Sequence, residues 1–310
     1  MRRIVLGLLG ATSMLAVPPR AAQAADMMQP TPLALVVSGI VESWTGYTFI
    51  ADPRHVHPDE DSFGSAGSTG RLSLPLGTNL SIQGDVDLEY NSTLLTDDDD
   101  DGSRDIFQLS AQSGVHVSWR DPNLGLLGGF IAVGQGEADV TSNAFLAVGG
   151  EGQLYFGPFT LYGQGGVLNP DADGLSIENE FQDAFFARGV ARYFFNENSF
   201  FGSDNRLQAE FAFVDGDIDH GDDQGQILEW GARYDLTLDL PIIGQTHAFL
   251  GYRGARFENQ DEDDSFFDHT VYVGSSYSFG GPTMQDFDRT GATLDLPNFG
   301  RWSSSGQIIR

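Results

Sequence analysis

Apolar and polar residues alternate without interruption from Leu80 to Tyr90. One set of alternate positions holds Leu80, Ile82, Gly84, Val86, Leu88 and Tyr90, and the other holds Ser81, Gln83, Asp85, Asp87 and Glu89. Successive side chains of a β-strand point to opposite faces, so this stretch predicts a strand with one apolar and one polar environment. A soluble sheet provides these two environments, and so does the wall of a membrane barrel.

The same alternation recurs along the chain and predicts an all-β protein. It is clear from Phe107 to Arg120, and a hairpin is indicated around Gly157 and Pro158. We predict twelve strands, at residues 33–49, 69–74, 80–90, 107–120, 126–134, 144–156, 159–168, 184–195, 207–214, 227–238, 246–257 and 267–279.

The connections between these strands form two sets that alternate along the chain. Short turns are predicted at residues 75–79, 121–125, 157–158, 196–205 and 239–244. Longer, acidic connections are predicted at residues 51–62, 91–106, 135–143, 169–183, 215–226 and 258–266. An up-and-down antiparallel path places the two sets at opposite ends of the strands, which is typical of a transmembrane β-barrel.

Aromatic residues on the apolar face favour the barrel over a soluble sandwich. Near the short turns lie Trp119, Phe156, Phe159, Tyr193, Tyr277 and Phe279. Toward the long connections lie Tyr90, Phe107, Phe185, Phe213 and Trp230. Two aromatic belts that flank an apolar band are what a barrel in lipid requires.

Residues 1–24 are predicted to be a signal peptide. Arg2 and Arg3 precede a short apolar run, and a small-residue cleavage site ends at Ala24. No later stretch approaches the roughly 20 continuous apolar residues of a membrane-spanning helix, so we expect the mature chain to be soluble or to span the membrane as a barrel. We divide the chain into the signal peptide, a barrel at residues 25–279 and a tail at residues 280–310.

Composition excludes several classes of function. The chain has no cysteine, which excludes disulfides, thiolate metal sites and cysteine nucleophiles. Its formal net charge is −28 at pH 7, and all of its basic residues are arginines. Such a charge repels nucleic acid, so we expect no nucleic-acid binding, and it attracts divalent cations.

With these features the chain resembles the porin-like outer-membrane β-barrels of Gram-negative bacteria. The resemblance rests on the signal peptide, on repeated segments such as residues 190–198, and on a final strand that carries Val271, Val273, Tyr277 and Phe279. It implies that the barrel-assembly machinery reads the final strand, that lipid and lipopolysaccharide surround the barrel, and that small solutes pass through it without a cofactor. Such barrels usually stop at the terminal aromatic residue, whereas this chain continues through the tail, which we expect to hang in the periplasm or to fold into the lumen.

Charged residues on the polar face are the candidate lumen and selectivity residues. They are Asp85, Asp87, Glu89, Arg188, Arg192, Glu210, Arg233 and Arg253. In one interpretation, acidic and basic walls face each other across a narrow pore and set a field on passing solutes. In the other, Glu210 bridges neighbouring arginines and the charges only neutralise a polar interior.

An acidic segment offers a candidate metal site. Asp97, Asp99 and Asp101 imitate the start of a calcium loop, but the twelfth position holds Gln108 where an EF-hand carries glutamate. The segment is either a solvated loop or a weak site for Ca²⁺ or Mg²⁺. A melting temperature that is indifferent to calcium and to chelator would identify a solvated loop.

A hydrolase is the third and minor functional class that we consider. His116 and Ser118 form a His-x-Ser pair of the kind that outer-membrane lipid hydrolases use, but the alternation turns both inward, and no adjoining acid is evident in the sequence. His220 and His269, beside loop acids, suggest a protease only weakly. The leading expectation is therefore a passive channel and not an enzyme, and the alternative is a non-conducting barrel whose acidic loops bind cations or a partner.

Overall fold

The computed structural model describes residues 34–51, 62–92, 109–138, 141–169, 181–195, 204–218, 223–240, 244–260 and 264–304. The predicted signal peptide and the candidate metal ligands Asp97, Asp99 and Asp101 lie outside these residues.

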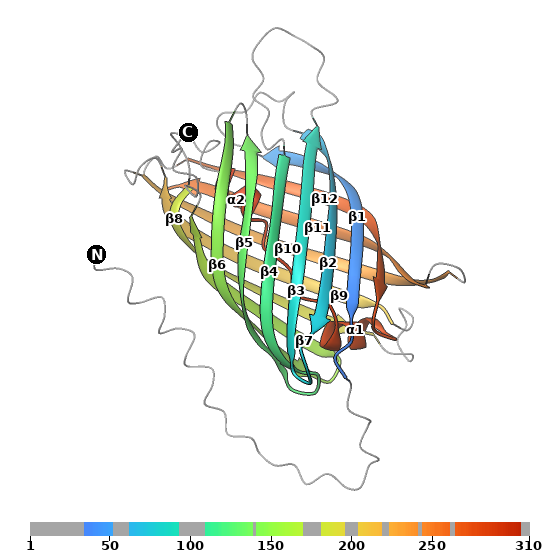
Figure 1. Ribbon diagram of the computed structural model, residues 1–310. Coiled ribbons are helices and arrows are strands. Elements are labelled where there is room, and N and C mark those ends of the chain that lie inside the picture. The colour runs from blue at the N-terminus through green and yellow to red at the C-terminus, as the bar shows by residue number, and fades with distance from the viewer. Residues whose placement is uncertain are drawn as a thin grey trace. The chain divides into compact units, whose positions relative to one another are not determined.

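The described residues form a closed antiparallel barrel (Figure 1), which confirms the predicted class and the number of strands. Its twelve strands are β1 (Ser38–Ala51), β2 (Ser62–Pro75), β3 (Leu80–Ser92), β4 (Leu109–Asp121), β5 (Gly125–Ala138), β6 (Thr141–Phe156), β7 (Phe159–Asn169), β8 (Phe181–Phe194), β9 (Arg206–Ile218), β10 (Asp223–Leu240), β11 (Gly244–Asn259) and β12 (Asp264–Phe279).

Each strand pairs with its neighbours in the sequence, and the first strand pairs with the last. The seam between β1 and β12 runs from Gly39 opposite Phe279 to Ala51 opposite Phe267. Closure of the sheet satisfies the main-chain groups that an open edge would expose, which is the condition for a sheet to cross lipid.

The predicted alternation is confirmed in β3. The side chain of Val86 is 52% exposed and points outward, whereas Asp85 is 2% exposed and faces the lumen. The outward face of the barrel is therefore apolar, and it includes aromatic residues near both ends, such as Trp119 and Phe279 at the short turns and Tyr90 and Phe185 toward the long connections. A soluble protein would bury such a surface, so this face is suited to lipid.

Several strands extend further toward the long connections than the sequence predicts. β9 ends at Ile218 and β10 begins at Asp223, so Asp215 and Asp217 belong to β9 and not to a loop at residues 215–226. Asp217 pairs with Gln224 in the sheet. The main-chain ladder outweighs the low strand propensity of aspartate and glycine here, because propensity is a weak preference beside tertiary pairing.

β2 is also longer than the predicted strand at residues 69–74, because it begins at Ser62. Its first half is rich in serine and glycine and gives little strand signal. Gly67 shows why glycine is needed here, because a Cβ atom on it would lie 2.3 Å from the indole nitrogen of Trp44. The inward Trp44 ring thus occupies the space that a side chain on β2 would fill.

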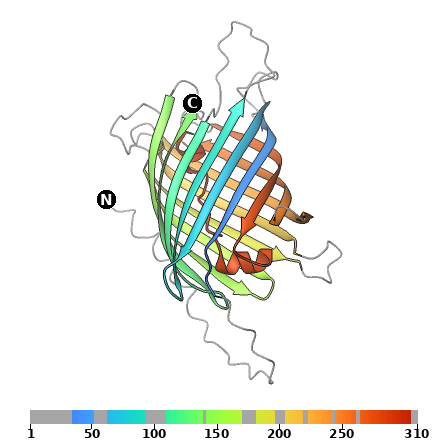
Figure 2. The same cartoon turned by 45° about the vertical axis from the view of Figure 1, so that its right-hand side comes forward.

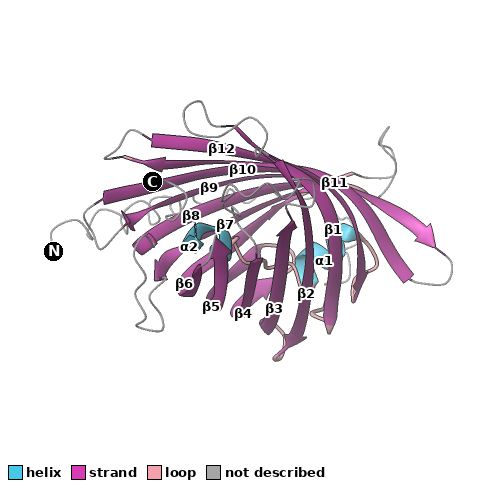
Figure 3. Cartoon of the chain, turned by 90° about the horizontal axis from the view of Figure 1, so that it is seen from above, coloured by secondary structure: helices cyan, strands magenta, loops and turns pink. Residues whose placement is uncertain are grey.

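The tail lies inside the barrel and not free in the periplasm. It forms α1 (Met284–Thr290), a segment at residues 291–298 without helix or strand, and α2 (Phe299–Ser304). Viewed down the barrel, these elements lie within the ring of strands (Figure 3). Neither described helix is long and apolar enough to cross a membrane.

The tail runs from the short-turn end of the lumen to the long-connection end (Figure 2). At the short-turn end, the α1 residue Gln285 donates a hydrogen bond of 2.6 Å to the carbonyl of Gly157, in the β6–β7 turn. At the other end, Asn143, near the start of β6, donates to the carbonyl of Ser303 in α2 at 3.3 Å. The described tail therefore extends along most of the lumen.

We expect Val86→Arg to impair insertion by roughly 2 to 4 kcal/mol, because it places a charge on the lipid face near the middle of β3. The unfolding free energy of the barrel in lipid vesicles measures this cost. Val86→Leu is the matched control and should insert normally. Equal unfolding free energies for the two variants would contradict a lipid-facing Val86.

The direction of the tail predicts that an epitope inserted after Ser304 is reached by antibody in intact cells, since the long connections of such barrels face outward. A matched epitope in the β2–β3 turn at residues 76–79 should be labelled only after the outer membrane is permeabilised. Labelling of neither epitope in intact cells would contradict the orientation.

Candidate functional site

The lumen wall holds the main chain of the tail through side-chain donors. Arg120 Nη1 donates to the carbonyl of Gly291 at 2.6 Å, and Gln112 Nε2 donates to that of Pro297 at 2.8 Å. Three more carbonyls of the tail accept hydrogen bonds from the wall. Arg192 donates to the carbonyl of Thr293 at 3.3 Å, Gln83 to that of Leu294 at 2.6 Å, and Gln164 to that of Asp295 at 2.8 Å. Buried carbonyl groups that would lack water as a partner are thus satisfied by the wall.

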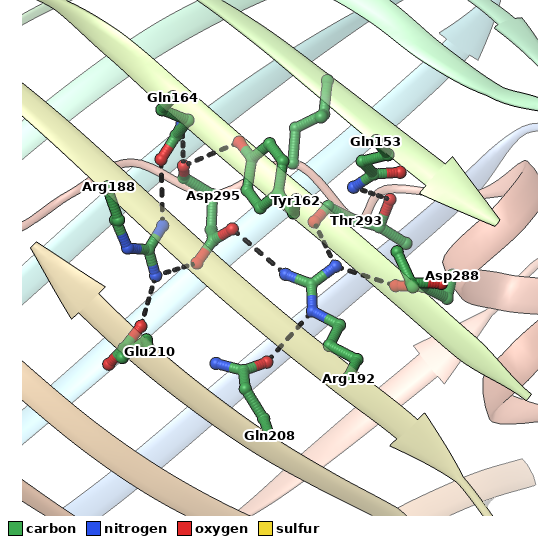
Figure 4. Close-up of polar contacts among 12 residues, drawn as sticks. Gln153, Tyr162, Gln164, Arg188, Arg192, Gln208, Glu210, Asp288, Thr293 and Asp295 are labelled. Atoms are coloured by element: carbon green, nitrogen blue, oxygen red, sulfur yellow. Dashed lines mark hydrogen bonds and ion pairs between the residues drawn. The ribbon is translucent and has the colours of Figure 1, made fainter. Parts of the chain in front are cut away.

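Two carboxylates of the tail are fixed by two arginines of β8 (Figure 4). The Asp295 carboxylate forms ion pairs with Arg188 at 2.8 Å and with Arg192 at 3.2 Å. Asp288, in α1, forms an ion pair with Arg192 at 2.8 Å and accepts a hydrogen bond from the hydroxyl of Thr160 at 2.7 Å. Arg188 and Arg192 lie four residues apart on one strand and therefore share its lumen face.

Aromatic packing fixes the α2 end of the tail. The Phe299 ring lies 5.1 Å from the Phe186 ring, 5.8 Å from Phe145 and 6.2 Å from Phe130, measured between centroids. Trp302 packs beside Phe299 and donates its indole N–H to Glu229 at 2.9 Å. Both aromatic side chains of α2 are essentially inaccessible to solvent, so they serve as apolar anchors inside a polar lumen.

A buried polar cluster lies on the wall behind the tail. His116 Nδ1 is 2.9 Å from a Glu151 carboxylate oxygen, and His116 Nε2 is 3.1 Å from an Asp85 oxygen. Glu151 also accepts a hydrogen bond of 2.7 Å from the Tyr162 hydroxyl. The statement that no acid adjoins His116 is therefore wrong, because β3 and β6 bring Asp85 and Glu151 to its two ring nitrogens.

The hydrolase interpretation finds no support in this geometry. Ser118 shares a hydrogen bond of 2.9 Å with Ser81, and both His116 and Ser118 are buried toward the lumen. His269 hydrogen-bonds the Tyr252 hydroxyl at 2.8 Å and stacks on Phe49. His220 lies outside the described residues.

A cavity of about 170 Å³ remains between the tail and the opposite wall. The tail contributes residues 295–298 to its lining, and the wall contributes residues from β1–β4 and β8–β12. Its charged lining comprises the carboxylates of Glu42, Asp87, Glu89, Glu210, Glu229 and Asp295 and the guanidinium groups of Arg71, Arg188, Arg233 and Arg253.

The eight predicted lumen charges lie on the inner face of the barrel, and most of them are in contact with an opposite charge. Glu89 pairs with Arg253 at 2.8 Å. Arg188 pairs with Glu210 at 2.6 Å, which is the contact that the neutralising interpretation expects of Glu210. Asp87 accepts a hydrogen bond from the amide of Gln112 at 3.3 Å.

Arg233 lies in a further ion-pair group that the sequence does not reveal. It contacts both Glu42 and Asp235, and Asp235 also receives Arg206 at 3.0 Å. Glu42 receives Arg71 at 3.4 Å. Neighbouring arginines are therefore separated by carboxylates all around this half of the wall, which limits the unneutralised charge in a low-dielectric interior.

Sequence reasoning missed the tail as part of the site. Asp288, Asp295, Phe299 and Trp302 belong to a segment that a strand pattern cannot place. The signal in the sequence is a run that mixes acidic, aromatic and small residues after the final strand, beside a wall that carries arginines. The described residues contain no group of three or more histidine, aspartate or glutamate side chains that could hold a metal ion.

Gly300 permits close approach of α2 to the wall. A Cβ atom on it would lie 2.1 Å from the Ser110 hydroxyl oxygen and 3.0 Å from the Gln135 carbonyl oxygen. We expect Gly300→Ala to reduce the unfolding free energy by about 1 to 3 kcal/mol, because α2 must shift. Urea unfolding followed by tryptophan fluorescence measures this loss, and Ser110→Gly in the same chain should restore part of it. Unchanged stability of the single variant would contradict the close contact.

Comparisons with known proteins place the fold. No family model and no curated protein matches the sequence. The COG4313 outer membrane channel from Pseudomonas putida F1 matches with a TM-score of 0.52 and 13% identity, over 82% of this chain and 100% of that chain. The KdgM porin matches with a TM-score of 0.40 and 10% identity, over 76% of this chain and 99% of that chain. The likeness is one of fold, and the chain has the fold of an outer-membrane β-barrel channel.

Proposed function

We propose that this barrel is a narrow passive channel for small solutes in the outer membrane of a Gram-negative bacterium. The observation that carries the proposal is the charged cavity between the tail and the opposite wall. Such a cavity suits small polar solutes, because its polar lining can replace part of the water around them. Its size of about 170 Å³ excludes folded proteins and long oligomers as solutes.

The tail sets the width of the proposed path. Its residues 295–298 form one side of the cavity, and the ion pairs of Asp295 with Arg188 and Arg192 hold that side in place. A twelve-stranded barrel leaves limited interior space, and an inserted segment reduces it further. We therefore expect a small conductance.

The lining also predicts a preference for cations. Six carboxylates face four guanidinium groups, and two of the carboxylates, Asp87 and Glu229, accept hydrogen bonds from the neutral groups of Gln112 and Trp302. A water-filled path with an excess of negative charge concentrates cations.

The second candidate is a barrel that does not conduct. The observation that favours it is the burial of the tail, whose aromatic residues fill the lumen toward the long connections. In that case the charges of the lumen serve the folding of the tail, and the barrel acts through its outer surface and acidic connections, with Ca²⁺ or Mg²⁺ at Asp97, Asp99 and Asp101 as the proposed ligand.

The same proposal includes the route and surroundings of the chain. Residues 1–24 act as a cleaved signal peptide, the barrel-assembly machinery receives β12, and lipid and lipopolysaccharide contact the outward apolar face. The chain needs no cofactor and is proposed to have no enzymatic activity. The lumen position of His116 and Ser118 supports the last point, because a lipid substrate lies on the other side of the wall.

In planar bilayers, the purified protein is expected to give discrete, small conductance steps with a preference for K⁺ over Cl⁻ in a salt gradient. Asp87→Asn with Glu229→Gln should reduce the permeability ratio several-fold, by removing two of the six carboxylate charges that line the cavity. Asp121→Asn, in a short turn, is the matched control and should leave the ratio unchanged.

Removal of two arginines should change the selectivity of the same path in the opposite direction. Arg188→Ala with Arg192→Ala should increase the preference for K⁺ and, by freeing Asp295, increase the conductance. Unchanged selectivity in a variant that still conducts would remove the pore interpretation. Silence of the wild-type protein at all voltages would favour the non-conducting barrel.

A further inference from the structure

We propose that the lumen wall is a binding site for a polypeptide that ends in a helical turn after an extended segment, and that the tail occupies this site in the intact chain. The site recognises an acidic residue followed, four and seven residues later, by two aromatic residues, as Asp295, Phe299 and Trp302 are spaced here. The proposal names a class of ligand for the lumen of the proposed channel, and to that extent it rests on the proposed function.

The contacts of the wall are mainly with groups that every peptide has. Five carbonyls between Gly291 and Pro297 accept hydrogen bonds from side chains of β3, β4, β7 and β8. Main-chain recognition of this kind binds an extended peptide with little regard to its side chains, as in peptides that add to a sheet edge. Here side-chain amides and guanidinium groups take the place of the sheet edge.

The bound segment is extended. Gly291 is held by Arg120 and Pro297 by Gln112, which lie eight residues apart on β4, whereas only six residues separate them on the tail. A strand rises roughly 3.3 Å per residue, so a segment that was helical throughout could not follow the wall over this length. Short turns occur at its ends, where Thr293 N–H donates to the Gly291 carbonyl and Phe299 N–H donates to the Pro297 carbonyl.

Specificity comes from the anchors. The Asp295 carboxylate bridges Arg188 and Arg192, and a peptide without an acidic residue there would leave these arginines short of a partner. Phe299 and Trp302 enter a pocket of Phe130, Phe145 and Phe186, where their exposed fractions are 0% and 1%. Aromatic anchors in fully desolvated pockets usually dominate the affinity of such interfaces.

One contact is incomplete in a way that points to another ligand. Gln112 donates its amide N–H to the carbonyl of Pro297, but its buried amide oxygen has no hydrogen-bond partner among the described residues. In an extended chain, the N–H and the carbonyl of one residue point to the same side, so a side-chain amide can hold both. Proline has no N–H to donate, so the tail leaves this acceptor unsatisfied.

A peptide with any other residue at this position can supply the missing donor. The tail is thus an imperfect occupant of the site that holds it, and a free peptide can compete with it despite the advantage that covalent attachment gives the tail.

The test uses full-length protein in detergent whose own tail is weakened by Asp295→Ala and Trp302→Ala, which leaves the wall intact. The probe is a fluorescent synthetic peptide of residues 291–304, and anisotropy measures its dissociation constant. We expect the peptide to bind the weakened chain at least about 10-fold more tightly than the wild-type chain, in which the tail competes. A peptide with the same two alanines should bind the weakened chain at least about 10-fold more weakly.

Two further peptides isolate the missing donor. One has alanine in place of Pro297 and the other has N-methylalanine, which differs only in lacking the N–H. The alanine peptide is expected to bind roughly 2- to 10-fold more tightly, which corresponds to one net hydrogen bond. This difference should vanish in a chain that also carries Gln112→Met, because methionine has no amide oxygen.

If the weakened chain does not fold, a second host is the wild-type chain with a protease site inserted after Pro282. The protease is added only after the wall and the tail have folded together, so the cut does not interfere with folding. Exchange of the cut tail for the labelled peptide then gives the same comparison. A folded host of either kind that binds the peptide no better than a scrambled peptide would overturn the proposal. Binding in detergent does not require conduction, so the proposed channel and the peptide site can fail separately.

Discussion

The inner face of this closed barrel carries polar and charged side chains that pack together with little water, so their charges must be neutralised. This constraint governs the structure. Strand alternation places one polar side chain inward at every second position, so twelve strands bring many charges into a narrow space. Isolated buried charges are costly, and each is tolerated only with a partner. The chain meets this demand in two ways: some charges of the wall pair between strands, and others pair with the tail.

This division explains why the tail and the cavity lie where they do. On the side of β3–β8, glutamines and arginines point at tail carbonyls and carboxylates, and the aromatic pocket receives α2. On the side of β9–β12 and β1, arginines pair with carboxylates of the wall itself, such as Arg233 with Glu42 and Arg206 with Asp235. The cavity lies between this side and the tail.

The sequence predicts the wall well because the wall obeys a local rule. Period-two alternation, as in β3, assigns each side chain to lipid or lumen from its immediate neighbours, and it also gives the number of strands and the orientation of the candidate charges. The pairing of those charges is not local: Glu89 and Arg253 are separated by 164 residues, and Glu42 and Arg233 by 191. No spacing in the sequence reveals such partners. The tail could not be placed for the same reason, since its backbone contacts come from four strands and leave no periodic signal.

The position of the tail also joins the two ends of the barrel. Phe287 in α1 and Ala292 in the connecting segment pack against Ile40 of β1, while the tail itself follows directly from β12. They bring the segment that follows the last strand against the first strand, beside the seam between β1 and β12. The tail therefore adds side-chain packing to the main-chain ladder that closes the barrel, and it links the two ends of the sheet.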